Sequence, residues 1–115
     1  MCLIMNDNDE VTKIAMKIIL AAGDARNLIN KAVKEKAVNL DFDGADFYMK
    51  KAKEKLVEAH NAQTSIVQNE AAGKKYEYSL LMTHAMDTVM TITSEFNITE
   101  NVLMIQRKGY EKYGK

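Results

Sequence analysis

Proline and tryptophan are absent from this sequence of 115 residues, and it contains only five glycines and one cysteine. A β-sandwich or barrel of this length would need many tight turns, so the shortage of glycine and proline favours a few long elements. One cysteine cannot form an internal disulfide or a cysteine-based zinc site. The length supports a single domain, expected to comprise residues 1–115.

An excess of charge is also absent, because sixteen basic residues balance sixteen acidic ones. The balance gives no overall electrostatic attraction to DNA, RNA or anionic lipid, so no nucleic-acid partner is expected. No run approaches the ~18 apolar residues of a membrane-spanning helix, which argues against direct membrane insertion. The apolar start is too short for a signal peptide, so we expect a cytoplasmic protein with flexible residues 1–6 and an unpaired thiol at Cys2.

Apolar residues recur at steps of three and four, which predicts amphipathic helices. The first helix is expected from about residue 9 to 37. The run Asp7-Asn8-Asp9-Glu10 provides its start signal, since a capping residue is followed three places later by a glutamate. The apolar face of this helix consists of Val11, Ile14, Ala15, Ile18, Ile19, Ala22, Ala25, Ile29, Ala32 and Val33.

Two further helices follow the first. Asp41 or Asp43 is expected to cap the second, and Gly73 is expected to end it in a left-handed conformation. The third runs from a cap at Ser79 to about Tyr113. The second helix carries a stricter heptad seam of Phe42, Ala45, Met49, Ala52, Leu56, Ala59, Gln63 and Ile66.

Each predicted helix is close to thirty residues long, or ~45 Å at ~1.5 Å per residue. Helices of this length joined by short connections are typical of an elongated antiparallel bundle. The fold class predicted from the sequence is therefore all-α, with three helices arranged as in a spectrin repeat.

The third helix has two rows of residues rather than one. A lone three-helix bundle needs one buried stripe per helix, so the second row is expected to be buried against another subunit. Polar residues in such a seam can fix register and oligomer number. The core row is Ala85, Val89, Ile92, Phe96 and Leu103, and the second row is Leu80, His84, Asp87, Thr91, Ser94, Ile98, Val102 and Ile105.

His84 and Asp87 lie in the polar middle of this second row, three positions apart on one helix. One interpretation is that they hydrogen-bond each other or belong to a polar surface patch. The other is that His84 is a nucleophile whose basicity is raised by a nearby negative charge. The spacing alone leaves both interpretations open.

Three motifs on the predicted helices resemble those of one protein family. Ala22-Gly23-Asp24-Ala25-Arg26 resembles its first-helix signature, and Glu58-Ala59-His60-Asn61-Ala62-Gln63-Thr64 resembles its second-helix motif, E-A-H-x-x-Q-T. His84-Ala85-Met86-Asp87-Thr88-Val89-Met90-Thr91 resembles its active-site helix, commonly H-A/G-Q-D-H-L-M-T. The family is the lactose/cellobiose-type enzyme IIA of the phosphoenolpyruvate-dependent sugar phosphotransferase system, and the resemblance extends from about Val11 to Tyr113.

The resemblance implies a homotrimer of three-helix subunits that forms a nine-helix bundle. It implies that His84 accepts a phosphoryl group from the phosphocarrier protein HPr and passes it to a cysteine of enzyme IIB, in the uptake of a lactose- or cellobiose-like sugar. Asp87 matches a carboxylate that meets its symmetry mates on the trimer axis around a divalent cation. Three converging carboxylates repel, so either some bind protons or a hard cation such as Mg²⁺ lies among them.

Two residues depart from the family motif: Met86 replaces its glutamine and Thr88 its second histidine. The nucleophile and the metal-site aspartate remain, so we interpret the chain as a phosphohistidine carrier. The alternative is a non-catalytic trimeric helical module with an interaction or regulatory role. Which sugar is transported stays open, since lactose, cellobiose, chitobiose and related β-linked disaccharides all fit.

Other polar and sulfur-containing side chains receive weaker predictions. His60 is expected to have a hydrogen-bonded structural role, and Gln63 places an amide in the apolar seam, where it must find partners. Met82, Met86 and Met90 are interpreted either as core filler or as part of an apolar docking ring near the reactive histidine.

Overall fold

The protein is an elongated bundle of helices that measures 66 × 26 × 18 Å. The structure is a computed structural model that describes residues 7–114, with side chains from residue 10 onward. The expected flexibility of residues 1–6 and the free thiol of Cys2 lie outside the described residues. Within the described part of the chain there is no β-strand, so the predicted all-α fold is confirmed.

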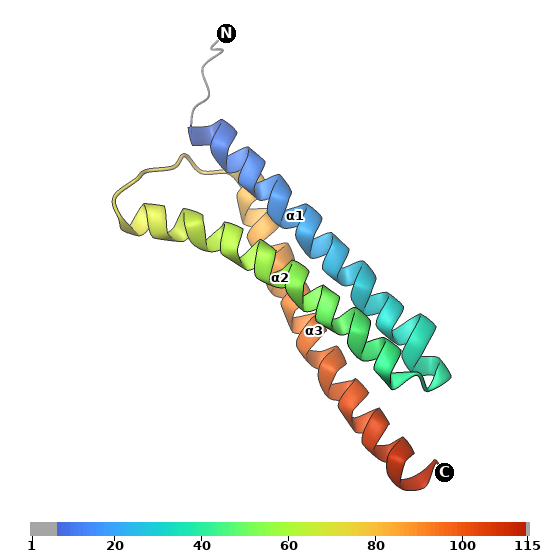
Figure 1. The fold of residues 1–115 in the computed structure, drawn as a ribbon. Helices are drawn as coiled ribbons and strands as arrows, with labels where there is room; N and C mark the ends of the chain where they lie inside the picture. Colours follow the sequence, from blue (N-terminus) through green and yellow to red (C-terminus); the bar gives the residue numbers. More distant parts are fainter. Residues whose placement is uncertain (1–6, 115) are drawn as a thin grey trace.

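Three long helices lie side by side, and successive helices run in opposite directions (Figure 1). α1 comprises Asp7–Lys31, α2 comprises Phe42–Ala71 and α3 comprises Leu80–Tyr113. A π-helical turn, Ala32–Lys36, and a 3-10 turn, Ala37–Asn39, follow α1 and lead into α2. The connection from α2 to α3 is a longer loop at the opposite end of the bundle, as Figure 1 shows.

The core lies along the shared axis of the three helices and has no buried polar side chain among the described residues. The apolar faces predicted for the three helices are the faces that pack together, and Gln63 of the α2 seam is half-buried. Small alanines alternate with larger side chains, which lets the helices approach closely. The buried set is Val11, Ala15, Ile18, Ala21, Ala22, Ala25, Ile29, Ala32, Ala37, Phe42, Ala45, Met49, Ala52, Leu56, Ala59, Ile66, Met82, Ala85, Val89, Ile92, Phe96 and Leu103.

The helical segment predicted from about residue 9 to 37 is present, but its last part is not regular α-helix. The structure describes α1 from Asp7, so the run from Asp7 to Glu10 lies within the described helix. Its regular α-helical part ends at Lys31, before the π-helical turn. Ala32 and Ala37 are both buried although they are five positions apart, a spacing that a π turn brings onto one side and an α-helix does not.

The other helix ends follow the sequence signals. The Asp41 carboxylate accepts a hydrogen bond from the Gly44 backbone N–H at 2.9 Å, so Asp41 rather than Asp43 caps α2. Gly73 adopts φ +103°, the left-handed conformation expected after the end of a helix. The Ser79 hydroxyl accepts from the Met82 backbone N–H at 3.1 Å and caps α3.

Leu40 is the one non-glycine residue with positive φ among the described residues, at φ 63° and ψ 19°. A side chain in this conformation costs about 1–2 kcal/mol, and glycine avoids that strain at the expense of a more flexible unfolded chain. We expect Leu40→Gly to raise the free energy of unfolding by up to about 1 kcal/mol, measured by urea denaturation. Val38→Gly in the adjacent 3-10 turn is the control and should lower it; an equal loss in both variants would contradict the strain.

Candidate functional site

His84 lies in the second turn of α3, with its side chain exposed to solvent. Its neighbour Ala85 is fully buried in the core and fixes the orientation of the helix at this point. The imidazole therefore points away from the bundle of its own chain. A ring in this position can be approached by another protein without any rearrangement of the fold.

In the first turns of α3, two threonine hydroxyls donate hydrogen bonds to backbone carbonyls four positions earlier. The Thr83 hydroxyl donates to the Ser79 carbonyl at 3.2 Å, and the Thr88 hydroxyl donates to the His84 carbonyl at 2.7 Å. Thr88, which replaces the family's second histidine, thus bonds to the backbone of its own helix. Met86, which replaces the family's glutamine, is half-buried and packs against the core. The backbone at His84 is held by these local contacts, while its ring stays exposed.

The loop that precedes α3 is tied to both neighbouring helices. The Lys74 Nζ atom lies 2.8 Å from the Glu10 carboxylate near the start of α1, and this hydrogen bond raises the pKa of Lys74 above its ordinary value. The Asn69 amide donates to the Tyr76 hydroxyl at 2.9 Å, and the Lys74 ammonium lies 5.0 Å from the centre of the Tyr76 ring. These contacts position the beginning of α3, and hence His84, but no helical periodicity in the sequence signalled them.

Asp87 is exposed on the same side of α3 as His84. No hydrogen bond or ion pair joins the two side chains among the described interactions, so the interpretation that they bond to each other within one chain is not supported. All eight residues of the second row, from Leu80 to Ile105, are exposed to solvent in the single chain. The row is therefore an unburied stripe with apolar ends and a polar middle.

The first-helix motif connects α1 to both other helices. The Arg26 guanidinium forms two hydrogen bonds to the Glu95 carboxylate of α3, at 3.0 and 2.6 Å, and these bonds raise the pKa of Arg26. Asp24 lies 3.8 Å from the Lys55 ammonium of α2, and Lys55 lies 3.8 Å from Glu58 of the second-helix motif. These motif residues hold the helices in register at a distance from His84, and the sequence indicated their helices but not their partners.

His60 is far from His84, in a groove between α2 and α3 with a volume of about 220 Å³, beside Phe96 and Asn97. Its side chain is exposed and makes no hydrogen bond among the described interactions, so the predicted hydrogen-bonded role was wrong. Met82 is buried and Met86 half-buried, and they serve the core. Met90 alone of the three methionines is exposed, so these three residues do not form the predicted docking ring in the described part of the chain.

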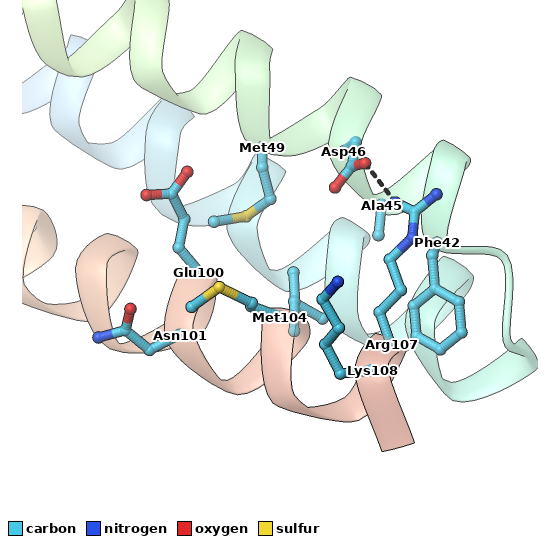
Figure 2. A pocket seen from close by; sticks show the side chains of 10 residues that line it. Phe42, Ala45, Asp46, Met49, Glu100, Asn101, Met104, Arg107 and Lys108 are labelled. Atoms are coloured by element: carbon cyan, nitrogen blue, oxygen red, sulfur yellow. Dashed lines mark hydrogen bonds and ion pairs between the residues drawn. The ribbon is translucent and has the colours of Figure 1, made fainter. Parts of the chain in front are cut away.

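A larger hollow, of about 380 Å³, lies between the start of α2 and the C-terminal half of α3 (Figure 2). Arg107 extends from α3 across its edge to Asp46, at 2.7 Å, and to Asp43, at 2.8 Å. The hydrogen bonds that the Arg107 guanidinium donates to these carboxylates raise the pKa of Arg107. This hollow is many helical turns from His84, so its contacts join α2 to α3 and do not belong to the histidine site.

No group of three His, Cys, Asp or Glu side chains in the described part of the chain is close enough to hold a metal ion. Asp87 is a suitable oxygen donor for a hard cation, and its carboxylate has no ion-pair partner among the described residues. One carboxylate does not form a cation site, so the donor set fits a bound cation only where several copies of Asp87 converge.

The sequence matches the family described as PTS system, Lactose/Cellobiose specific IIA subunit, over residues 13–107. Since this match covers most of the chain, the protein belongs to the lactose/cellobiose-specific enzyme IIA family of the sugar phosphotransferase system. The resemblance inferred from the three motifs is thus confirmed.

Relatives support the same assignment over nearly the full length of the chain. It is 32% identical over 103 residues to the PTS system lactose-specific EIIA component of Staphylococcus epidermidis, covering 90% of this chain and 98% of that protein. It is 34% identical over 107 residues to the lichenan-specific phosphotransferase enzyme IIA component of Bacillus subtilis, covering 93% and 96%.

Solved structures of the family share the fold. The crystal structure of PtcA from S. mutans superposes with a TM-score of 0.84 at 28% identity, covering 90% of this chain and 99% of that one. The PTS cellobiose-specific enzyme IIA from Bacillus anthracis superposes with a TM-score of 0.82 at 32% identity, covering 95% and 96%. Among the described residues of this chain, no helix combines the length and apolar character needed to cross a membrane.

Proposed function

We propose that this protein is a phosphohistidine carrier that works in the cytoplasm and takes part in the uptake of a lactose- or cellobiose-like sugar. His84 accepts a phosphoryl group from HPr and passes it to a cysteine of enzyme IIB. The observation that carries the proposal is the position of His84: within a chain of this family, its ring is exposed on α3 and the backbone beneath it is held by local hydrogen bonds.

The chemistry needs two transfers. In the first, a nitrogen of the neutral His84 imidazole attacks phosphorus, the P–N bond to the carrier's histidine breaks, and that imidazole leaves with the electron pair. In the second, a thiolate of enzyme IIB attacks phosphorus, a P–S bond forms, and His84 leaves as the free imidazole. Each transfer takes place between two docked proteins, so positioning and charge stabilisation do most of the work and no nucleotide pocket is needed.

We also propose that three copies assemble through the exposed row of α3 into a nine-helix homotrimer. Support comes from Ile98, Val102 and Ile105, which leave large apolar surfaces exposed along one stripe of the single chain. Burial of such a stripe between parallel copies of α3 would remove these side chains from water. The polar middle of the row would then fix the register of the copies.

In that trimer the three Asp87 carboxylates would meet at the axis, where a divalent cation such as Mg²⁺ would offset their repulsion. We expect Asp87→Leu to keep or tighten the trimer, because it removes three facing charges, and to abolish its response to the cation. The measurement is thermal unfolding with and without Mg²⁺: the wild type should be stabilised and the variant unaffected. Asp24→Leu, a carboxylate on α1, is the control and should keep the response to the cation. Dissociation of Asp87→Leu into monomers would contradict the axial position.

The test of the proposed carrier function is phosphorylation of the purified chain by phosphoenolpyruvate, enzyme I and HPr. Intact mass should increase by one phosphoryl group per chain, and the group should be lost in acid, as expected of a phosphoramidate. Omission of HPr should prevent the modification. A wild-type chain that stays unmodified in the full mixture would overturn the proposal and favour a helical module without catalytic activity.

A further inference from the structure

Two aromatic rings and three lysines form one continuous group on the α1–α2 face, near the turn that joins these helices. Phe47 and Tyr48 of α2 contact each other with ring centres 5.6 Å apart. The Lys51 ammonium lies 4.9 Å from the centre of the Phe47 ring, and those of Lys31 and Lys36 each lie 6.0 Å from the centre of the Tyr48 ring. We name this group the aromatic–lysine cluster.

The positive charge of the cluster is only weakly compensated. Of its three ammonium groups, only that of Lys36 has a carboxylate within ion-pair distance among the described residues, namely Asp41 at 3.7 Å. The neighbouring carboxylates Asp43 and Asp46 face α3, where Arg107 holds them. The Lys31 and Lys51 ammonium groups therefore carry positive charge on this face without a described carboxylate within ion-pair distance, although the whole chain has no net charge.

The same end of the bundle exposes apolar side chains. Phe47 is 57% exposed although Tyr48 and the Lys51 ammonium lie against its ring, and this is a large exposed fraction for a phenylalanine. Val38 and Leu40, in the turn between the π-helical segment and α2, are also exposed. Exposed apolar side chains near lysines are suited to the boundary between the headgroups and acyl chains of a bilayer.

From this arrangement we propose that the aromatic–lysine cluster docks the protein on the surface of an anionic phospholipid bilayer. The lysines supply attraction to the negative headgroups, and Phe47 supplies an apolar contact; two such signals together are needed for appreciable binding. The alternative partner, a nucleic acid, is disfavoured because bases stack on open ring faces, whereas lysine ammonium groups already lie over both rings.

The cluster shares no residue with the exposed row of α3, so lipid docking and self-association use different surfaces. The inference goes beyond the proposed carrier function and does not depend on it. If both hold, docking would concentrate the carrier at the membrane that contains the transporter it serves. If phosphorylation of His84 fails, binding to lipid can still be measured.

The experiment is co-sedimentation of the full chain with vesicles of phosphatidylcholine alone and of phosphatidylcholine mixed with phosphatidylglycerol. Binding should be restricted to vesicles with phosphatidylglycerol and should weaken as salt is added. The variant Lys31→Glu/Lys51→Glu should lower the affinity at least about tenfold, since each lysine near an anionic surface contributes substantially to binding. Phe47→Ala should lower the affinity while leaving its salt dependence in place.

The matched control is Lys17→Glu/Lys75→Glu, which changes the net charge equally outside the cluster, in the middle of α1 and in the loop between α2 and α3. It should bind the vesicles as the wild type does. Circular dichroism and thermal unfolding verify that each variant is folded, and all the replaced side chains are exposed. Equal loss in both double variants, equal binding to neutral vesicles, or binding to a single-stranded oligonucleotide in place of vesicles would overturn the proposal.

Discussion

His84→Ala is expected to accept no phosphoryl group from phosphorylated HPr, whereas the wild type accepts one per chain. The imidazole nitrogen is the nucleophile of the proposed transfer, and no neighbouring side chain of the described structure can replace it. The side chain is exposed, so its loss should leave the unfolding midpoint of the protein almost unchanged. The measurement is intact mass after incubation with phosphoenolpyruvate, enzyme I and HPr.

His60→Ala provides a matched control, because the chain contains two histidines and both are exposed. His60 lies in the groove between α2 and α3, away from the start of α3. The His60→Ala variant should therefore be phosphorylated to the same extent as the wild type. The opposite pattern, with His60→Ala inactive and His84→Ala phosphorylated, would assign the reaction to the other histidine.

Ile98→Glu is expected to dissociate the proposed trimer. The substitution removes an apolar contact of about 1.5–3 kcal/mol per copy and places three carboxylates in one seam. We expect association to weaken by at least about a hundredfold, since about 1.4 kcal/mol corresponds to each factor of ten. Light scattering coupled to size-exclusion chromatography would detect the change from trimer to monomer.

Leu20→Glu is the control for this substitution, because its exposure is almost equal: Ile98 is 63% exposed and Leu20 is 64% exposed. Leu20 belongs to the outer side of α1, outside the α3 row. A Leu20→Glu chain should elute as the wild type does. Dissociation by both variants, or by neither, would show that the α3 row is not the assembly surface.

Helical periodicity predicted most of the fold because it is a local property of the chain. The residues that repeat at steps of three and four on each helix are the ones that pack into the core. Asp41 caps α2 and Ser79 caps α3, and each side chain accepts a hydrogen bond from the backbone N–H three positions later. The same reasoning placed His84 and Asp87 outside the core, since their positions fall on the second row.

Predictions about individual partners were less successful, because the partners are distant in sequence. Nothing in the sequence pairs Arg26 with Glu95, which are 69 positions apart, or Lys74 with Glu10, which are 64 apart. Among the described residues, the hydrogen bond expected at His60 is not found, nor is the bond between His84 and Asp87 that was one of the two interpretations of their spacing. A side chain with several possible partners settles on one only when the helices are packed.

The sequence by itself determined three helices, their buried faces and the family to which they belong, since each depends on spacing within a segment or on short motifs. Only the tertiary structure decided the π-helical turn after α1, the contacts that hold the loop before His84, and the position of Lys31 and Lys36 beside the Tyr48 ring. These features depend on how α1, α2 and α3 pack, and packing brings together residues whose proximity no local pattern encodes.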